Sequence, residues 1–126
     1  MGRAALTIQD VTVRGLLEAL EGIEKTDGNS FLNDPRGHLM VAISNASTDE
    51  DIVATFVTPE VLTEGDSDPG LTVEDVSVTV AHGTRQIVAG WSSRFEQANP
   101  YGKQIWINWT GAAAEGDVTV GVFAIA

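Results

Sequence analysis

A strict alternation of apolar and hydroxyl side chains in the middle of the chain constrains its fold more than any other stretch. Val76, Val78 and Val80 alternate with Ser77 and Thr79. Successive side chains of a β-strand point to opposite faces, so the stretch predicts a strand with one valine face and one hydroxyl face. Such a strand needs paired neighbours and a second layer over its valine face. An all-β fold is therefore the first expectation.

The residues after this strand predict a β-hairpin. Ala81-His82-Gly83-Thr84 interrupts the alternation with a glycine that can adopt positive φ, and residues 85–89 resume it. We expect the two strands to pair with each other around an exposed turn that carries His82. The rest of the chain then supplies the strands that pair with this hairpin and cover its valine face.

Further strands are expected on both sides of the hairpin, at residues 38–45, 52–58, 103–110 and 117–126. Residues 52–58 are apolar on both sides, which is typical of a strand inside a sheet or covered on both faces. Short strands separated by turn signals predict an antiparallel β-sandwich or a small jelly-roll-like barrel of about six to eight strands. In this fold the valine face packs on the apolar stripes of residues 39–43 and 118–122.

The first 30 residues differ from the rest, and we expect an N-terminal arm (residues 1–30) before a β-sandwich domain (residues 31–126). Residues 7–10 start either a helical turn or a strand that continues through Val11 and Val13. An amphipathic helix is predicted further on, and an extended arm laid over a neighbouring subunit is the alternative. The expected helix has apolar residues at helical spacing, namely Leu16, Leu17, Leu20 and Ile23.

Composition excludes several classes of protein. The 126 residues carry a net charge of −11 and include no cysteine, so we expect no disulfide framework and no nucleic-acid partner. No apolar run approaches the ~20 residues that span a bilayer, and no signal peptide is recognisable, so we expect no membrane association. Dispersed acids with only two lysines, Lys25 and Lys103, are typical of proteins from a high-salt cytoplasm; an ordinary acidic protein is the alternative.

The sequence offers little for catalysis or metal binding. His38 and His82 are the only histidines, and neither lies in a nucleophile motif, so we expect no enzyme and no cofactor. A weak candidate for a structural cation site is the loop with alternating carboxylates, and a solvated loop is the alternative. Its residues are Glu64, Asp66 and Asp68, and a still weaker candidate is the run Asp49-Glu50-Asp51.

Aromatic residues gather in the last third of the chain and predict a contact surface. Trp106 and Trp109 fall on opposite faces of one expected strand, so one of them lies outside a one-sided core. Another subunit, the loop of residues 91–102 or the N-terminal arm then covers it. Protein contact is favoured over a sugar-stacking platform. The predicted interface residues are Leu16, Leu17, Leu20, Trp91, Phe95, Tyr101 and Trp106.

Several segments of the chain resemble, in their order and pattern, small all-β head proteins of tailed phages and archaeal tailed viruses. They are β-patterns and turns rather than catalytic signatures, and they extend over most of the chain. The segments are residues 6–10, 31–37, 41–45, 76–85, 105–109 and 118–122.

This resemblance implies a structural virion protein that binds the major capsid protein lattice. It would decorate or stabilise the head, or form a turret base, as a homo-oligomer on the capsid exterior after assembly in the host cytoplasm. Together with the acidic surface, it implies a haloarchaeal host. A head–tail connector or tail structural protein is one alternative. A carbohydrate-binding β-sandwich module is the other.

Overall fold

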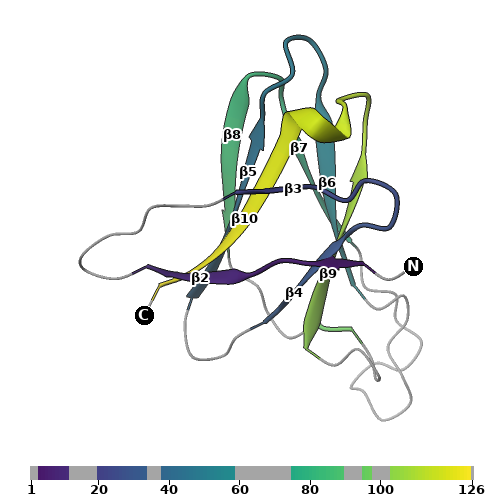
Figure 1. Ribbon diagram of the computed structural model, residues 1–126. Coiled ribbons are helices and arrows are strands. Elements are labelled where there is room, and N and C mark those ends of the chain that lie inside the picture. Colours follow the sequence, from purple (N-terminus) through teal and green to yellow (C-terminus); the bar gives the residue numbers. More distant parts are fainter. Residues whose placement is uncertain are drawn as a thin grey trace.

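The computed structural model describes residues 3–11, 20–33, 38–58, 75–89, 95–97 and 103–125. These residues form two sheets that pack face to face and enclose one apolar core (Figure 1). The expected all-β sandwich is confirmed, and the sheets do not close into a barrel. Within the described ranges there is no α-helix, and no helix long and apolar enough to cross a membrane.

Each sheet has five strands. Sheet A has the order β1-β4-β9-β6-β7, and sheet B has the order β2-β10-β5-β8, with β3 paired to β10 on the same side as β2. A 3₁₀ turn at Glu115–Asp117 leads into the last strand. The strands are β1 (Ala4–Ala5), β2 (Ile8–Val11), β3 (Glu21–Gly22), β4 (Asn29–Leu32), β5 (His38–Asn45), β6 (Ile52–Val57), β7 (Val76–Val80), β8 (Thr84–Ala89), β9 (Gln104–Thr110) and β10 (Val118–Ile125).

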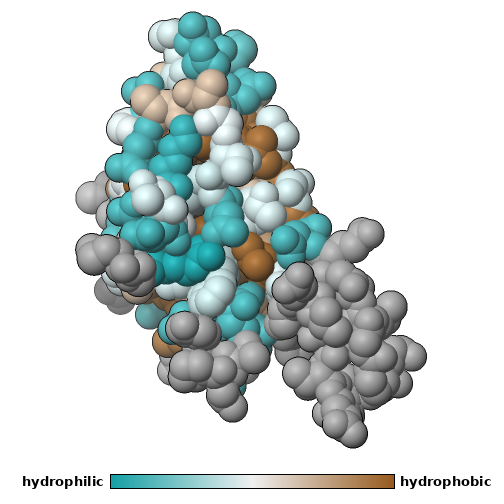
Figure 2. Space-filling view, turned by 90° about the vertical axis from the view of Figure 1, so that its right-hand side faces the viewer, coloured by the Kyte–Doolittle hydropathy of each residue, from teal (hydrophilic) through white to brown (hydrophobic). Residues whose placement is uncertain are grey.

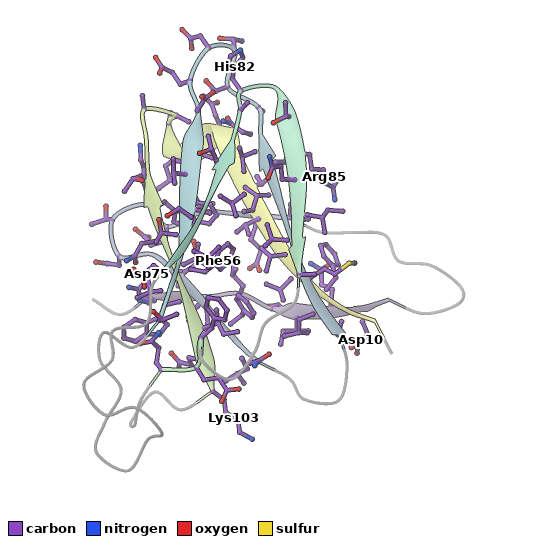
Figure 3. All side chains as sticks on the ribbon, turned by 180° about the vertical axis from the view of Figure 1, so that it is seen from behind. Asp10, Phe56, Asp75, His82, Arg85 and Lys103 are labelled. Carbon is purple, nitrogen blue, oxygen red and sulfur yellow. The ribbon has the colours of Figure 1, made fainter. Side chains whose placement is uncertain are left out.

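The strands predicted from alternation are present, and their apolar faces meet in the core. Val80 is fully buried, and Val76 and Val78 pack against the core cluster. Strand β6 lies between β9 and β7, as its two apolar sides predict. Figure 3 shows Phe56 of β6 between the two sheets. The stripes expected to cover the valine face are buried in the same cluster, namely Leu39, Val41, Ile43, Val118, Val120 and Val122.

The predicted hairpin at residues 76–89 is wrong. Strand β7 pairs with β6 in sheet A, whereas β8 pairs with β5 in sheet B. The turn with Gly83 (φ 70°) therefore carries the chain from one sheet to the other. Alternation fixes which face of a strand is apolar but does not select its neighbour. Here both strands direct an apolar face into the same core from opposite layers, with Val80 and Val88 packed in one cluster.

The N-terminal residues that the structure describes are strands of the sandwich. Strand β2 pairs in parallel with β10, which agrees with the strand alternative for residues 7–11. The helix predicted to reach Ile23 is wrong over its last residues, because Glu21 and Gly22 form β3 and the amide of Ile23 bonds the carbonyl of Val118 at 3.3 Å. Its earlier part, with Leu16 and Leu17, lies outside the described residues.

The boundary expected between residues 30 and 31 falls inside β4. Strand β1 pairs in parallel with β4, and with the β2–β10 pair this makes both sheets mixed rather than antiparallel. The alternating pattern of the chain does not encode strand direction. The parallel partner of β1 lies 25 positions later in the chain, and that of β2 lies 114 positions later.

Candidate interaction face on sheet A

The outward side of sheet A, here called the A face, carries Trp106, the one predicted interface residue that the described strands place on the outside of this sheet. Alternation along β9 buries Ile105, Ile107 and Trp109 and leaves Trp106 and Asn108 on the outside. The strand registers place the other members of this face beside them. The A face comprises Ser30, Leu32, Val53, Thr55, Val57, Ser77, Thr79, Gln104, Trp106, Asn108 and Thr110.

The A face is uncharged along its strands. None of its residues is acidic, although the chain as a whole has a net charge of −11. Figure 2 shows this side of the molecule as hydrophilic and intermediate residues with small hydrophobic areas between them. Thr55 and Ser77 share a hydrogen bond of 3.0 Å between their hydroxyls, and Asn108 and Thr110 are exposed. This surface can offer hydroxyl and amide groups to a partner without electrostatic repulsion.

Trp106 is the aromatic centre of the A face, and Arg3 lies over its ring. The guanidinium carbon of Arg3 is 4.3 Å from the ring centroid, within the range of a cation–π contact. Arg3 also donates from Nη1 to the carbonyl of Ile107 at 3.1 Å, and Trp106 donates from Nε1 to Oε1 of Gln104 at 3.1 Å. The ring is thus fixed and half-buried. Among the described residues, the N-terminal arm provides one of the three covers expected for this tryptophan.

Gly28 makes room for Arg3. Its φ of +82° is in the left-handed region, and a Cβ at this position would collide with the Arg3 guanidinium and lie 2.6 Å from the carbonyl oxygen of Ile107. Partial burial lowers the pKa of Arg3, and the nearby charge of Asp27 opposes this shift. Arginine nevertheless remains protonated in proteins, so the A face carries one fixed positive charge.

Beneath this pair, Asn29 joins the N-terminal strand to the core of sheet A. Its Oδ1 accepts from Nε1 of the buried Trp109 at 2.8 Å and from the amide of Glu24 at 3.0 Å. Its Nδ2 donates to the carbonyl of Ala4 at 3.2 Å. Sequence reasoning missed both Asn29 and Arg3, because single polar residues without a motif carry no local signal of such contacts.

The remaining predicted interface residues have different surroundings. Phe95 was expected as an exposed anchor, and this is wrong: its side chain is only 6% exposed and belongs to the core cluster. Leu20 packs on the outside of sheet B, where its Cδ2 would lie 2.8 Å from a Cβ atom added to Gly121. Leu20 therefore packs on the sandwich of its own chain. Outside the described residues lie Leu16, Leu17, Trp91 and Tyr101.

The end of the sandwich near β7 and β8 holds the second polar cluster. Asp51 Oδ1 accepts from the amide of His82 at 3.0 Å and lies 3.2 Å from its Nδ1. These contacts, the backbone bond first, lower the pKa of Asp51. Both side chains are about half exposed, at 51% and 52%, and Figure 3 shows His82 at the tip of the molecule. The exposed position expected for His82 is confirmed.

No cluster of three or more metal-ligating side chains occurs in the described part of the chain. Asp49, Glu50 and Asp51 are exposed there, and the backbone of this loop is held by Asn45 and Ser47, with Asn45 Nδ2 donating to the carbonyl of Glu50 at 2.9 Å. The other candidate cation ligands lie outside the described residues, namely Glu64, Asp66 and Asp68.

Comparisons with protein-family models, with curated proteins and with solved structures found no match for this chain. The fold and the geometry of the A face are therefore the observations from which a function has to be argued.

Proposed function

We propose that this chain is a non-catalytic structural protein of a tailed virus, which binds the major capsid protein lattice through the A face and decorates or stabilises the head. The observation that supports the A face as the binding surface is the pair of Arg3 and Trp106, which lies on a sheet among uncharged strand side chains. Tryptophan and arginine are the residue types that most often dominate the binding energy of protein interfaces.

The charge distribution supports a protein partner. A chain with a net charge of −11 repels other acidic surfaces, but the strand residues of the A face carry no charge, and Arg3, with Asp27 near it, lies above them. Its apolar members, Leu32, Val53, Val57 and Trp106, lie among hydroxyl and amide groups that can pair with a partner's backbone. In a symmetric shell the contact is repeated many times, so a modest affinity for each copy is sufficient.

The capsid lattice as the partner, and the exterior of the virion as the location, are proposed from the resemblance of segments such as residues 31–37 and 76–85 to small all-β head proteins. The haloarchaeal host is proposed from the acidic composition. A surface rich in carboxylates repels itself less when the Debye length falls to about 3 Å at 1 M salt. The three proposals are separable, because the A face can serve as a contact surface in any host.

A binding assay tests the proposed surface. Assembled shells of the major capsid protein encoded in the same genome are incubated with the purified chain and sedimented. We expect Trp106→Ala to raise the dissociation constant at least about tenfold, the size of effect typical of a central aromatic anchor. Ser44→Ala, which changes the outside of sheet B, is the matched control and should bind like the wild type. Equal binding by both variants would contradict the A face as the contact.

A carbohydrate ligand is the second candidate, because an outward tryptophan beside Gln104 and Asn108 is also a surface that can stack a sugar ring and bond its hydroxyls. Arg3 over one side of the ring argues against it, since that side is then already in contact. A glycan array distinguishes the two. Saturable binding to one class of glycan that Trp106→Ala abolishes would favour the sugar ligand, and a flat response would remove it.

A further inference from the structure

The first four described residues, residues 3–6, lie along the edge of sheet A and are here called the clasp. Strand β1 of the clasp pairs in parallel with β4 of sheet A, whereas the next strand, β2, pairs with β10 of sheet B. Figure 1 shows this N-terminal segment in purple, running across the molecule beside both sheets. Leu6 and Thr7 belong to neither strand. The chain therefore passes from one sheet to the other at these two residues.

Few contacts hold the clasp in place. Ala4 and Ala5 are exposed, and Leu6, which is 7% exposed, is the one side chain of the clasp that is buried in the core. The amides of Ala4 and Leu6 donate to the carbonyls of Gly28 and Ser30, at 3.1 Å and 2.8 Å. A short segment near a chain end that buries little apolar surface opens locally at a lower free-energy cost than the core strands.

The rest of sheet A does not depend on the clasp. Strand β4 pairs with β9 on its other side along its whole length. Asn29 donates to the carbonyl of Ala4 at 3.2 Å, but its bonds with Trp109 and with the amide of Glu24 involve no clasp residue. Strand β2 is held by four residue pairs with β10. Opening of the clasp therefore leaves the other pairs of both sheets intact.

Arg3 connects the clasp to the A face. Its guanidinium carbon lies 4.3 Å from the centroid of the Trp106 ring, and its Nη1 donates to the carbonyl of Ile107 at 3.1 Å. Arg3 is only partly buried, so water competes for both contacts. Because Arg3 covers one side of the ring, access to that side depends on the position of the clasp.

We propose that the clasp opens as a unit about Thr7 while both sheets stay folded, and that its opening uncovers the side of the Trp106 ring that Arg3 covers. The closed clasp is then an autoinhibitory contact on the A face. A partner that stacks on this side of the ring binds only open molecules, so its apparent affinity is reduced by the open fraction. Regulation of binding to a shell rests on the proposed function, whereas the opening is a property of the chain alone.

Native-state hydrogen exchange followed by NMR tests the opening. The amides of Ala4 and Leu6 should exchange faster than those of the central strands β6 and β9. Low concentrations of denaturant should change their rates little, because a local opening exposes little surface. Exchange of the clasp amides at the rate of β6 and β9, with the same dependence on denaturant, would overturn the proposal.

A pair of variants makes the exchange test specific. Leu6→Ala removes the buried side chain of the closed clasp, so it should lower the protection factors of the amides of residues 4 and 6 at least about tenfold. Ile43→Val is the matched control, because it trims a fully buried side chain of β5 and should leave these two protection factors unchanged. Equal effects of the two variants would show that the clasp opens only when the whole chain unfolds.

Hydroxyl-radical footprinting with mass spectrometry tests the link to Trp106. Leu6 belongs to the core cluster and Trp106 does not, so Leu6→Ala should alter access to the Trp106 ring through the clasp. Oxidation of Trp106 should rise several-fold in this variant, whereas oxidation of the buried Trp109 should not change. Unchanged oxidation of Trp106 would contradict the gating.

Sedimentation with assembled shells of the major capsid protein separates this inference from the proposed function. Leu6→Ala should bind the shells several-fold more tightly than the wild type, because more molecules are open. Equal or weaker binding would contradict the autoinhibition. If neither chain binds, the proposed partner is wrong, and the exchange and footprinting results still decide whether the clasp opens and uncovers the ring.

Discussion

The guanidinium carbon of Arg3 lies 4.3 Å from the centroid of the Trp106 ring, so the first described residue of the chain covers the aromatic centre of the A face. This contact links the N-terminal strand to β9. It also determines which side of the tryptophan a partner can reach. Stability and binding are therefore both expected to depend on Arg3.

Arg3→Ala should lower the free energy of unfolding by about 1–2 kcal/mol. It removes the cation–π contact and the charge-assisted hydrogen bond to Ile107, both on a partly exposed side chain. Chemical denaturation followed by far-UV circular dichroism measures the change. Arg3→Lys keeps the charge but not the planar group, and should recover only part of the loss. If Arg3→Ala unfolds at the same denaturant midpoint as the wild type, the contact between Arg3 and Trp106 has no structural role.

Gly28→Ala should destabilise the fold by about 1–3 kcal/mol, the cost of a non-glycine residue in the left-handed region, with displacement of Arg3 in addition. The control is Gly22→Ala, whose Cβ would meet no atom within 4 Å and whose φ is not positive. That variant should change stability much less. Thermal unfolding of both variants under identical conditions makes the comparison. Equal midpoints would show that neither the backbone conformation at residue 28 nor the atoms around it require a glycine.

Asn29→Ala should cost about 1–3 kcal/mol, because it leaves the indole N–H of the buried Trp109 without its acceptor. The double variant with Trp109→Phe removes donor and acceptor together. Its loss should be smaller than the sum of the two single losses if the bond is what couples them. Strictly additive losses in a denaturation series would contradict the coupling.

Acidification should remove the contribution of Asp51. Its pKa is lowered by the bonds from His82, so the folded-state pKa lies below the unfolded-state value, near 3.9 for a free aspartate. The stabilisation is then present above that unfolded pKa and is lost as the pH falls through the folded pKa. Asp51→Asn should differ from the wild type near neutral pH and converge with it in acid. A difference in thermal midpoint that stays constant down to low pH would contradict this linkage.

Salt should stabilise the chain, since its net charge of −11 is dispersed over the surface. Raising KCl from about 0.1 M to about 3 M reduces the Debye length from about 10 Å to below about 3 Å and screens the self-repulsion. The midpoint of thermal unfolding should rise across this range. A flat or falling midpoint would contradict the adaptation to high salt.

Most of the strands were predicted from burial of one face, which imposes a period of two, and residues 52–58 were predicted from their two apolar sides. The predicted ranges were 38–45, 52–58, 76–80, 85–89, 103–110 and 117–126. The alternation did not predict that β7 and β8 belong to different sheets. A connection between the two sheets and a β-hairpin can have the same alternating strands and the same glycine turn. The helical spacing of Leu20 and Ile23 misled for a related reason: Glu21 and Gly22 between them pair with β10. The period of a segment indicates which of its faces is apolar, whereas the strand that it pairs with depends on how the whole core packs.

The candidate site was predictable only in part. The opposite orientations of Trp106 and Trp109 follow from strand alternation, and the structure bears them out. The cover of Trp106 could not be assigned, since Arg3 and its acceptor Ile107 are 104 positions apart. Phe95 was misplaced because a short segment without a regular period gives no indication of which side faces the core.

We propose above all that the chain is a repeated component of a virus head. Quantitative mass spectrometry of purified particles of the virus that encodes it tests this most directly, as the molar ratio of the chain to the major capsid protein. We expect a fixed, simple ratio, with many copies in each particle. A few copies confined to one ring would instead indicate the head–tail connector or tail role. Absence from the particles would contradict the claim.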